Sequence, residues 1–178
     1  AEVDPRGAAV VMEWDDNHHL LSMTDQNGHI TAYTYDTNGN LLTETAPDGG
    51  VTVYTYDSKG RMVEKTDALG GVTAYEYVNG LLAKVTDREG NETAYTYDAH
   101  GYLSAMTDAL GNVTQYEYDA SGNLLRLTFA DGTSVSYIYD ALGRQTSMTN
   151  PKGGVTKYAY DALGNLIKTT LPDGTVQT

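Results

Sequence analysis

The sequence has 178 residues, a formal net charge of −13, 15 tyrosines against one phenylalanine and one tryptophan, 19 glycines and no cysteine. The negative charge opposes binding to nucleic-acid phosphates and to anionic lipid. Without cysteine, disulfides, thiolate metal sites and cysteine nucleophiles are excluded. No apolar run reaches the roughly 18 residues of a membrane-spanning helix. We therefore expect neither a nucleic-acid partner nor membrane insertion.

Pairs of tyrosines separated by one residue organise the chain. Seven pairs follow one another at steps of 21 residues, with a single step of 20 between the third pair and the fourth. Such a period is typical of a stacked or spiralling repeat protein, which offers a surface or an enclosure before it offers a catalytic site. The pairs are Tyr33/Tyr35, Tyr54/Tyr56, Tyr75/Tyr77, Tyr95/Tyr97, Tyr116/Tyr118, Tyr137/Tyr139 and Tyr158/Tyr160.

The region before the first pair differs from the rest. Residues 1–11 are expected to form an N-terminal extension. Residues 12–32 form a degenerate first repeat, in which Trp14 and Asp15 replace Tyr-Asp, and this copy is either a cap or a worn repeat. Residues 33–178 contain the seven repeats, without a linker or a second domain. The predicted organisation is a single repeat domain.

Each repeat predicts two strands and two tight turns. In the unit from residue 54, Asp57 and Asp67 each stand at the first position of a type I turn, with glycine at the fourth. The intervening stretches 61–66 and 71–77 are rich in Thr, Val and Tyr, which favour strands. The predicted fold class is therefore all-β, built from antiparallel β-hairpins with a 21-residue period.

Strand alternation assigns side chains to faces. It places both tyrosines of a pair on one face, and we expect them to stack in file along successive hairpins, each aromatic contact contributing about 0.5–1.5 kcal/mol. Neither face is wholly apolar, and about sixteen strands make a ribbon too long to stay flat. A single curved or spiralling open sheet follows.

One repeat departs from the common turn. After Tyr77 the sequence continues Val78-Asn79-Gly80, so the aspartate and one residue are missing. Asn-Gly is the preferred pair of a two-residue hairpin, because both residues tolerate positive φ. We predict that this short hairpin replaces the longer turn.

The acidic residues and histidines suit simpler roles better than catalytic or metal sites. Asp36-Thr37-Asn38-Gly39-Asn40 superficially resembles a calcium loop, but it has no later bidentate glutamate, so the aspartates are interpreted as turn caps. Identical repeats cannot create the unequal pair of carboxyl groups that a hydrolase needs. His18, His19, His29 and His100 belong to no repeating constellation and are expected to be solvated loop residues. We assign no catalytic residue, metal or cofactor.

The repeat Tyr116-Glu117-Tyr118-Asp119, followed by Gly122 and Leu124, has the form Tyr-x-Tyr-Asp-x-x-Gly-x-Leu and resembles the RHS or YD repeats. That family includes bacterial Rhs polymorphic toxins, shell subunits of insecticidal toxin complexes and the teneurins, and the match covers residues 12–178. The resemblance implies a hairpin ribbon that spirals into a hollow shell around a C-terminal toxin segment. Its signature here comprises the tyrosine pairs together with Asp36, Gly39, Asp57, Gly60, Asp98, Gly101, Asp119, Gly122, Asp140, Gly143, Asp161 and Gly164.

Complete shells of this family are much longer and carry a plug and a self-cleaving C-terminal region, which this chain lacks. The resemblance therefore implies a non-enzymatic segment of shell wall from a larger secreted or cell-surface bacterial protein. Its partners would be the rest of that protein and the enclosed toxin segment. The alternative is a cell-surface adhesion module whose exposed tyrosines contact carbohydrate or protein. Exposed strand edges also favour self-association.

Overall fold

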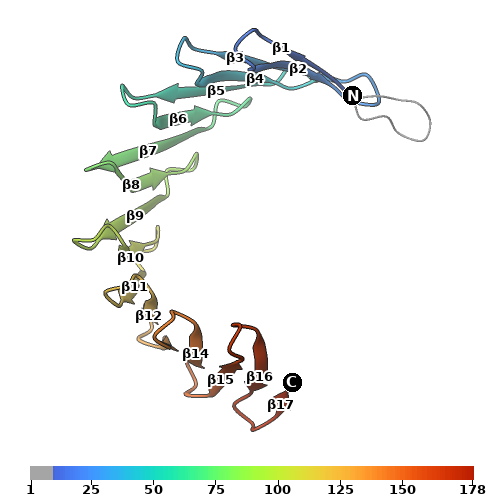
Figure 1. Cartoon of the computed structure of the whole chain (residues 1–178). Helices are drawn as coiled ribbons and strands as arrows, with labels where there is room; N and C mark the ends of the chain where they lie inside the picture. Colours follow the sequence, from blue (N-terminus) through green and yellow to red (C-terminus); the bar gives the residue numbers. More distant parts are fainter. Residues whose placement is uncertain (1–9) are drawn as a thin grey trace. The chain divides into compact units, whose positions relative to one another are not determined.

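The computed structural model describes residues 10–178, which form strands and tight turns without any helix (Figure 1). The chain divides after Glu92 into two compact units. Unit 1 contains β1 Val11–Trp14, β2 Leu20–Thr24, β3 Ile30–Tyr35, β4 Leu41–Thr45, β5 Val51–Tyr56, β6 Met62–Thr66, β7 Val72–Val78 and β8 Leu81–Thr86. Unit 2 contains the strands from β9 onward, apart from the first residue of β9.

The strands of unit 2 repeat the same pattern. They are β9 Glu92–Tyr97, β10 Leu103–Thr107, β11 Val113–Tyr118, β12 Leu124–Thr128, β13 Ser134–Tyr139, β14 Gln145–Thr149, β15 Val155–Tyr160, β16 Leu166–Thr170 and β17 Val176–Gln177. Within each unit every strand pairs antiparallel with the next one along the chain. The predicted all-β hairpin repeat is confirmed.

The turns have the predicted geometry. In the β3–β4 hairpin the Gly39 amide donates to the Asp36 carbonyl at 3.1 Å, and the Asp36 amide donates to the Asn40 carbonyl at 2.9 Å. Gly39 has φ of 85°, a left-handed conformation that costs other L-residues energy. The β7–β8 turn has positive φ at both Asn79 and Gly80, which confirms the predicted two-residue hairpin.

A β-bulge recurs in the second strand of the hairpins, and alternation alone did not reveal it. Tyr35 pairs with Leu41, whereas Thr34 pairs with Thr43, so Leu42 is an extra residue. Equivalent register shifts occur in the other tyrosine-bearing hairpins. The bulge lets the apolar residue at the start of the strand lie opposite the second tyrosine, while the rest of the strand keeps its register.

The described residues have no sealed hydrophobic core. Across residues 10–178 no apolar side chain is buried, and Thr156 is the single buried residue. In β5 the tyrosines are half-buried while Val51, Val53 and Thr55 are exposed. The expectation that neither face is dry is confirmed, and contacts between neighbouring strands must supply the stability of each unit.

The N-terminal region is described only in part. Of the predicted extension, residues 1–9 lie outside the described residues, and Val11 already belongs to β1. The β1–β2 turn bonds like the later ones, with His18 in the glycine position at φ of 66°. The proposed domain boundaries remain a prediction. No helix in residues 10–178 is long and apolar enough to cross a membrane.

Candidate functional surface

The two faces of each unit differ in exposure. All fourteen tyrosines of the seven pairs are half-buried and share what we call the tyrosine face. The residue between the two tyrosines is exposed in every pair, on what we call the opposite face. The site residues predicted from the sequence therefore form a regular framework, with tyrosines on strands and aspartates and glycines at the turns between them.

The hydroxyl of the second tyrosine ties successive repeats together. Tyr35, Tyr77 and Tyr139 each donate to the carbonyl oxygen of the residue 15 positions earlier, at 3.0 Å. Tyr160 donates in the same way to the Gln145 carbonyl at 2.8 Å. Because the acceptor is a backbone carbonyl, the residue that supplies it can be glutamine, as at Gln145, in place of leucine or methionine. Burial raises the pKa of Tyr139, so the hydroxyl stays protonated as a donor.

The turn aspartates act as caps, as predicted. One Asp36 carboxylate oxygen accepts the Asn38 and Asn40 amides, at 2.8 and 2.9 Å. The other accepts the Asn40 side-chain amide at 2.9 Å. In the next repeat the Arg61 side chain bonds Asp57 in the same manner, and these charged hydrogen bonds lower the pKa of Asp57 to about 2. Both oxygens are thus engaged within the turn.

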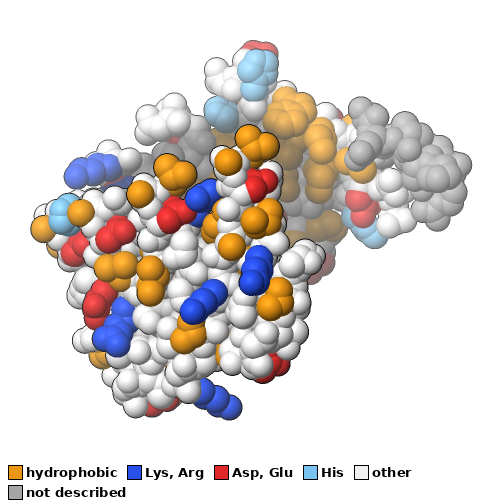
Figure 2. Space-filling view, turned by 60° about the horizontal axis from the view of Figure 1, so that its bottom comes forward, with side chains coloured by type: hydrophobic (Ala, Val, Ile, Leu, Met, Phe, Trp, Pro, Cys, Tyr) orange, Lys and Arg blue, Asp and Glu red, His pale blue; other side chains and the backbone are white. Residues whose placement is uncertain are grey.

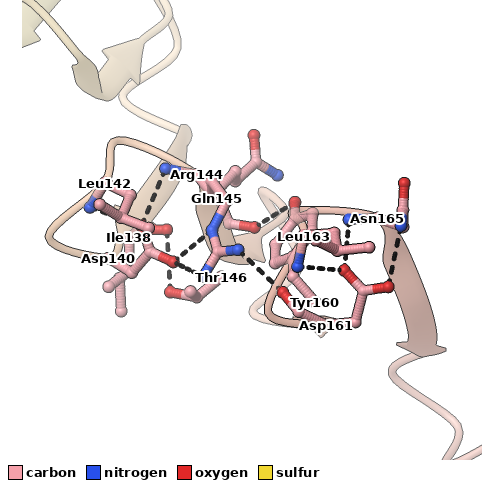
Figure 3. A network of polar contacts seen from close by, with 10 residues as sticks. All are labelled: Ile138, Asp140, Leu142, Arg144, Gln145, Thr146, Tyr160, Asp161, Leu163 and Asn165. Carbon is pink, nitrogen blue, oxygen red and sulfur yellow. Dashed lines mark hydrogen bonds and ion pairs between the residues drawn. The ribbon is translucent and has the colours of Figure 1, made fainter.

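The residue after the turn glycine links one repeat to the next, and we call it the bridging position. Figure 3 shows Arg144 between its own turn and the following one. Its Nε donates to Asp140 at 2.7 Å, its Nη1 donates to the Asp161 carbonyl at 3.3 Å, and its guanidinium lies 4.9 Å from the Tyr160 ring centre. A single side chain therefore caps one turn and packs on the next repeat.

Other residues fill the bridging position by the same geometry. Arg61 lies 4.4 Å from the centre of the Tyr77 ring. The His19 ring stacks on Tyr35 with centres 4.8 Å apart, and the Tyr102 ring contacts Tyr118 at 5.2 Å. Asn40, Asn123 and Asn165 occupy the same position and bond their turn aspartates. The sequence analysis missed this position, although flat or amide side chains recur there.

The expected stacking of tyrosine pairs is corrected by these contacts. The rings that stack on Tyr35 and Tyr118, and the guanidinium over Tyr160, come from the bridging position and not from the previous tyrosine pair. An intervening strand separates successive pairs by two strand spacings, about 9.6 Å, which is too far for ring contact. The tyrosines share a face, as predicted. The prediction that successive tyrosine pairs stack directly on one another was wrong at these positions.

The histidines also differ from expectation. His19 belongs to the repeating pattern, since its Nδ1 lies 2.8 Å from Asp15 in the bridging position. His29 forms the equivalent contact with Asp25 at 3.0 Å in the following turn. His18 and His100 lie in turns, as predicted. Imidazole fills these places because it is planar and can donate to a carboxylate.

The opposite face is exposed and variable. The residue between the tyrosines, and Glu13 at the equivalent place between Met12 and Trp14, pairs across the hairpin with a residue of the next strand, and the pairs change character along the chain. They are Glu13–Ser22, Thr34–Thr43, Thr55–Glu64, Glu76–Lys84, Thr96–Ala105, Glu117–Arg126, Ile138–Ser147 and Ala159–Lys168. Figure 2 shows hydrophobic side chains at the surface among charged ones. Sequence variation between the repeats is thus concentrated where side chains have fewest partners.

Hollows on the surface are shallow and lie between hairpins. One of them, about 600 Å³, opens between the turns of Asp36 and Asp57 and is also lined by Tyr54, Tyr56 and Lys59. Both carboxylates bond donors of their own turns, so neither is directed at a ligand in the hollow. In residues 10–178 no three acidic or histidine side chains gather as a metal site.

Comparisons with known proteins match this architecture. The family of the RHS repeat matches six overlapping segments, at residues 14–51, 35–72, 78–113, 103–134, 118–155 and 139–176. No curated protein sequence matches the chain. The crystal structure of TcdB2-TccC3-TEV is 19% identical, with a TM-score of 0.55, over 91% of this chain and 11% of that chain.

A second solved structure is similar over more of the chain but has a lower TM-score. The Photorhabdus luminescens Tc holotoxin pore is 18% identical over 98% of this chain and 14% of that chain, with a TM-score of 0.41. The chain therefore spans little more than a tenth of the length of these structures. From its repeated signature, its hairpin geometry and the segments matched, the chain belongs to the RHS repeat family.

Proposed function

We propose that the chain is a non-enzymatic wall segment of a larger bacterial RHS protein, secreted or displayed at the cell surface, that encloses or displays a partner polypeptide such as a C-terminal toxin. The observation that carries this proposal is the absence of a buried apolar residue anywhere in residues 10–178. A sheet that is held together strand by strand can be extended in either direction, which is what a wall requires.

The side-chain chemistry supports a structural role. The turn aspartates repeat one environment, in which hydrogen bonds from the following residues lower the pKa of Asp36, Asp119 and Asp161 alike. General acid–base catalysis needs neighbouring groups whose pKa values are driven apart. Equal environments favour a framework over an active site.

Because the chain spans about a tenth of the TcdB2-TccC3-TEV chain, the remainder of the parent protein would supply the rest of the wall. Enclosure is tested in the longer protein that carries this chain, by adding proteinase K and following the downstream segment. We expect protection in the unaltered protein and in Ile138→Ala. Protection should be lost in Ile138→Pro, because proline breaks strand β13. A downstream segment that is digested at the same rate in all three would overturn enclosure.

Carbohydrate adhesion through the tyrosines is the competing function. It is less favoured, because the tyrosines are half-buried and several hydroxyls already bond backbone carbonyls. A glycan array separates the two functions. Specific binding that is lost on substitution of Tyr54, whose hydroxyl contacts the side chain of Glu44, would support adhesion instead.

A further inference from the structure

The opposite face of unit 1 carries a compact acidic cluster between β6 and β9. Lys84 Nζ lies 2.6 Å from Glu76 and 2.9 Å from Glu92, and Glu64 lies diagonally across from Glu76 because it pairs with Ala74. The Glu76 and Glu92 side chains are 60% and 57% exposed, whereas Lys84 is 28% exposed. Two carboxylates, those of Glu76 and Glu92, thus share one ammonium group, and with Glu64 on the same face the cluster keeps an excess of negative charge.

Apolar side chains border this cluster on the same face. Val78 is 60% exposed and pairs with Leu81, which is also exposed. Val72 begins the same strand and is likewise exposed. Exposed valine and leucine beside carboxylates offer a partner apolar area and negative charge on one face. We refer to Glu64, Glu76, Glu92, Val72, Val78 and Leu81 as the β6–β9 patch.

The equivalent positions of unit 2 provide an internal contrast. There the opposite face carries Arg126, Lys157 and Lys168 with Glu117 as its only acidic strand residue among residues 93–178. Exposed Ile138 and Ile167 lie on the same face. The apolar character of the opposite face is therefore shared by both units, while the sign of its charge is not.

We propose that the β6–β9 patch is a docking surface for a cationic polypeptide segment in which lysine or arginine alternates with apolar residues. The proposal rests on the proposed function, since it names the chemistry of the partner polypeptide and the face that receives it. The net charge of −13 steers a cationic partner toward the chain and repels nucleic acid and anionic lipid. The exposed valines and leucine would then be covered by the apolar side chains of the partner.

The test uses the whole 178-residue chain and two fluorescent probe peptides, one of alternating valine and lysine and one of alternating valine and glutamate. We expect the lysine peptide to bind, with affinity that falls as salt is raised, and the glutamate peptide not to bind. The triple variant Glu64→Gln/Glu76→Gln/Glu92→Gln should weaken lysine-peptide binding about tenfold or more, and Val78→Ser should weaken it severalfold. Circular dichroism confirms that each variant is folded.

The matched control is Arg126→Gln/Lys157→Gln/Lys168→Gln, which should leave binding to the β6–β9 patch unchanged or slightly tighter. Equal binding of both peptides, no binding of the lysine peptide, or no loss in the glutamine triple variant would each overturn the proposal. Peptide-free self-association abolished by the same variant would assign the patch to a second copy of the chain and would also overturn it. Protease protection in the parent protein is measured separately, so docking and enclosure can fail independently.

Discussion

The tyrosine face and the opposite face of the same strands differ in how regularly their residue types recur. On the tyrosine face the second tyrosine of each pair lies opposite Leu, Met or, once, Gln145, and its hydroxyl bonds backbone where the bond is described. On the opposite face the residue between the tyrosines is Thr, Glu, Ile or Ala. The comparison teaches that one residue type recurs where a specific hydrogen bond or a turn geometry requires it, because such contacts fix the turns and hold neighbouring hairpins together.

The first tyrosine of each pair lies between these extremes. Its partner across the hairpin is Glu44 for Tyr33, Lys65 for Tyr54 and Leu127 for Tyr116. Long side chains can cover a phenol ring with their methylene groups whatever their terminal charge, which explains this tolerance. Lying on the tyrosine face is therefore not enough to restrict a position to one residue type. Such a restriction requires a specific hydrogen bond or a turn geometry.

Acidification should have the largest effect, because it acts on every turn that an aspartate caps and on no apolar contact of the opposite face. The folded-state pKa of Asp57 is about 2, below the unfolded value near 3.9, so its contribution to stability is present above about pH 4 and is lost as the pH falls toward 2. Urea unfolding followed at pH 7, 4, 3 and 2 measures this loss. Stability that stays constant down to pH 2 would contradict the capping role.

Truncating a ring on the tyrosine face should come next. Tyr118→Ala removes a half-buried ring that contacts Tyr102 and is expected to cost a few kcal/mol, at the level of aromatic truncations. Ile138→Ala, on the opposite face at 61% exposure, should change the free energy of unfolding by less than about 0.5 kcal/mol. Chemical denaturation of both variants makes the comparison, and similar costs would erase the distinction between the faces.

A glycine of the turns should give an intermediate effect. Gly122 has φ of 85°, and an added Cβ would lie 2.6 Å from the Tyr102 hydroxyl. Gly122→Ala is therefore expected to cost about 1–2 kcal/mol for the left-handed backbone, and more if Tyr102 must leave Tyr118. Gly111→Ala meets nothing within 4 Å at φ of 81° and reports the backbone cost alone. Thermal unfolding of the two variants isolates the bridging contact, and identical midpoints would show that this contact contributes nothing.

The smallest framework effect should come from one hydroxyl. Tyr139→Phe keeps the ring and removes the bond to the Leu124 carbonyl, which is expected to cost about 0.5–1.5 kcal/mol. Tyr137→Phe is the matched control, because the first tyrosine of that pair has no hydroxyl bond described here. Equal stability of the two variants in urea would mean that the hydroxyl bond is not what links the repeats.

Most of the fold could be predicted from local patterns. Asp57 and Gly60 mark a turn by their own conformational preferences, and Asn79-Gly80 marks a two-residue hairpin without reference to any distant residue. The candidate site was harder to predict. The acidic and apolar residues of the β6–β9 patch come from several strands, so their proximity depends on cross-strand register that the alternation pattern does not specify.

By itself the sequence determined the period, the turns, the pairing of consecutive strands and the face on which each tyrosine lies, because these follow from backbone preferences and from alternation over a few residues. Only the tertiary structure decided which side chain packs on each ring and where the bulge at Leu42 falls. It also decided that Arg144 or His19 performs the linking that tyrosine pairs were expected to perform. The physical reason is distance along the chain: partners 16 residues apart, such as Arg144 and Tyr160, meet only after the pairing of two neighbouring strands has been set.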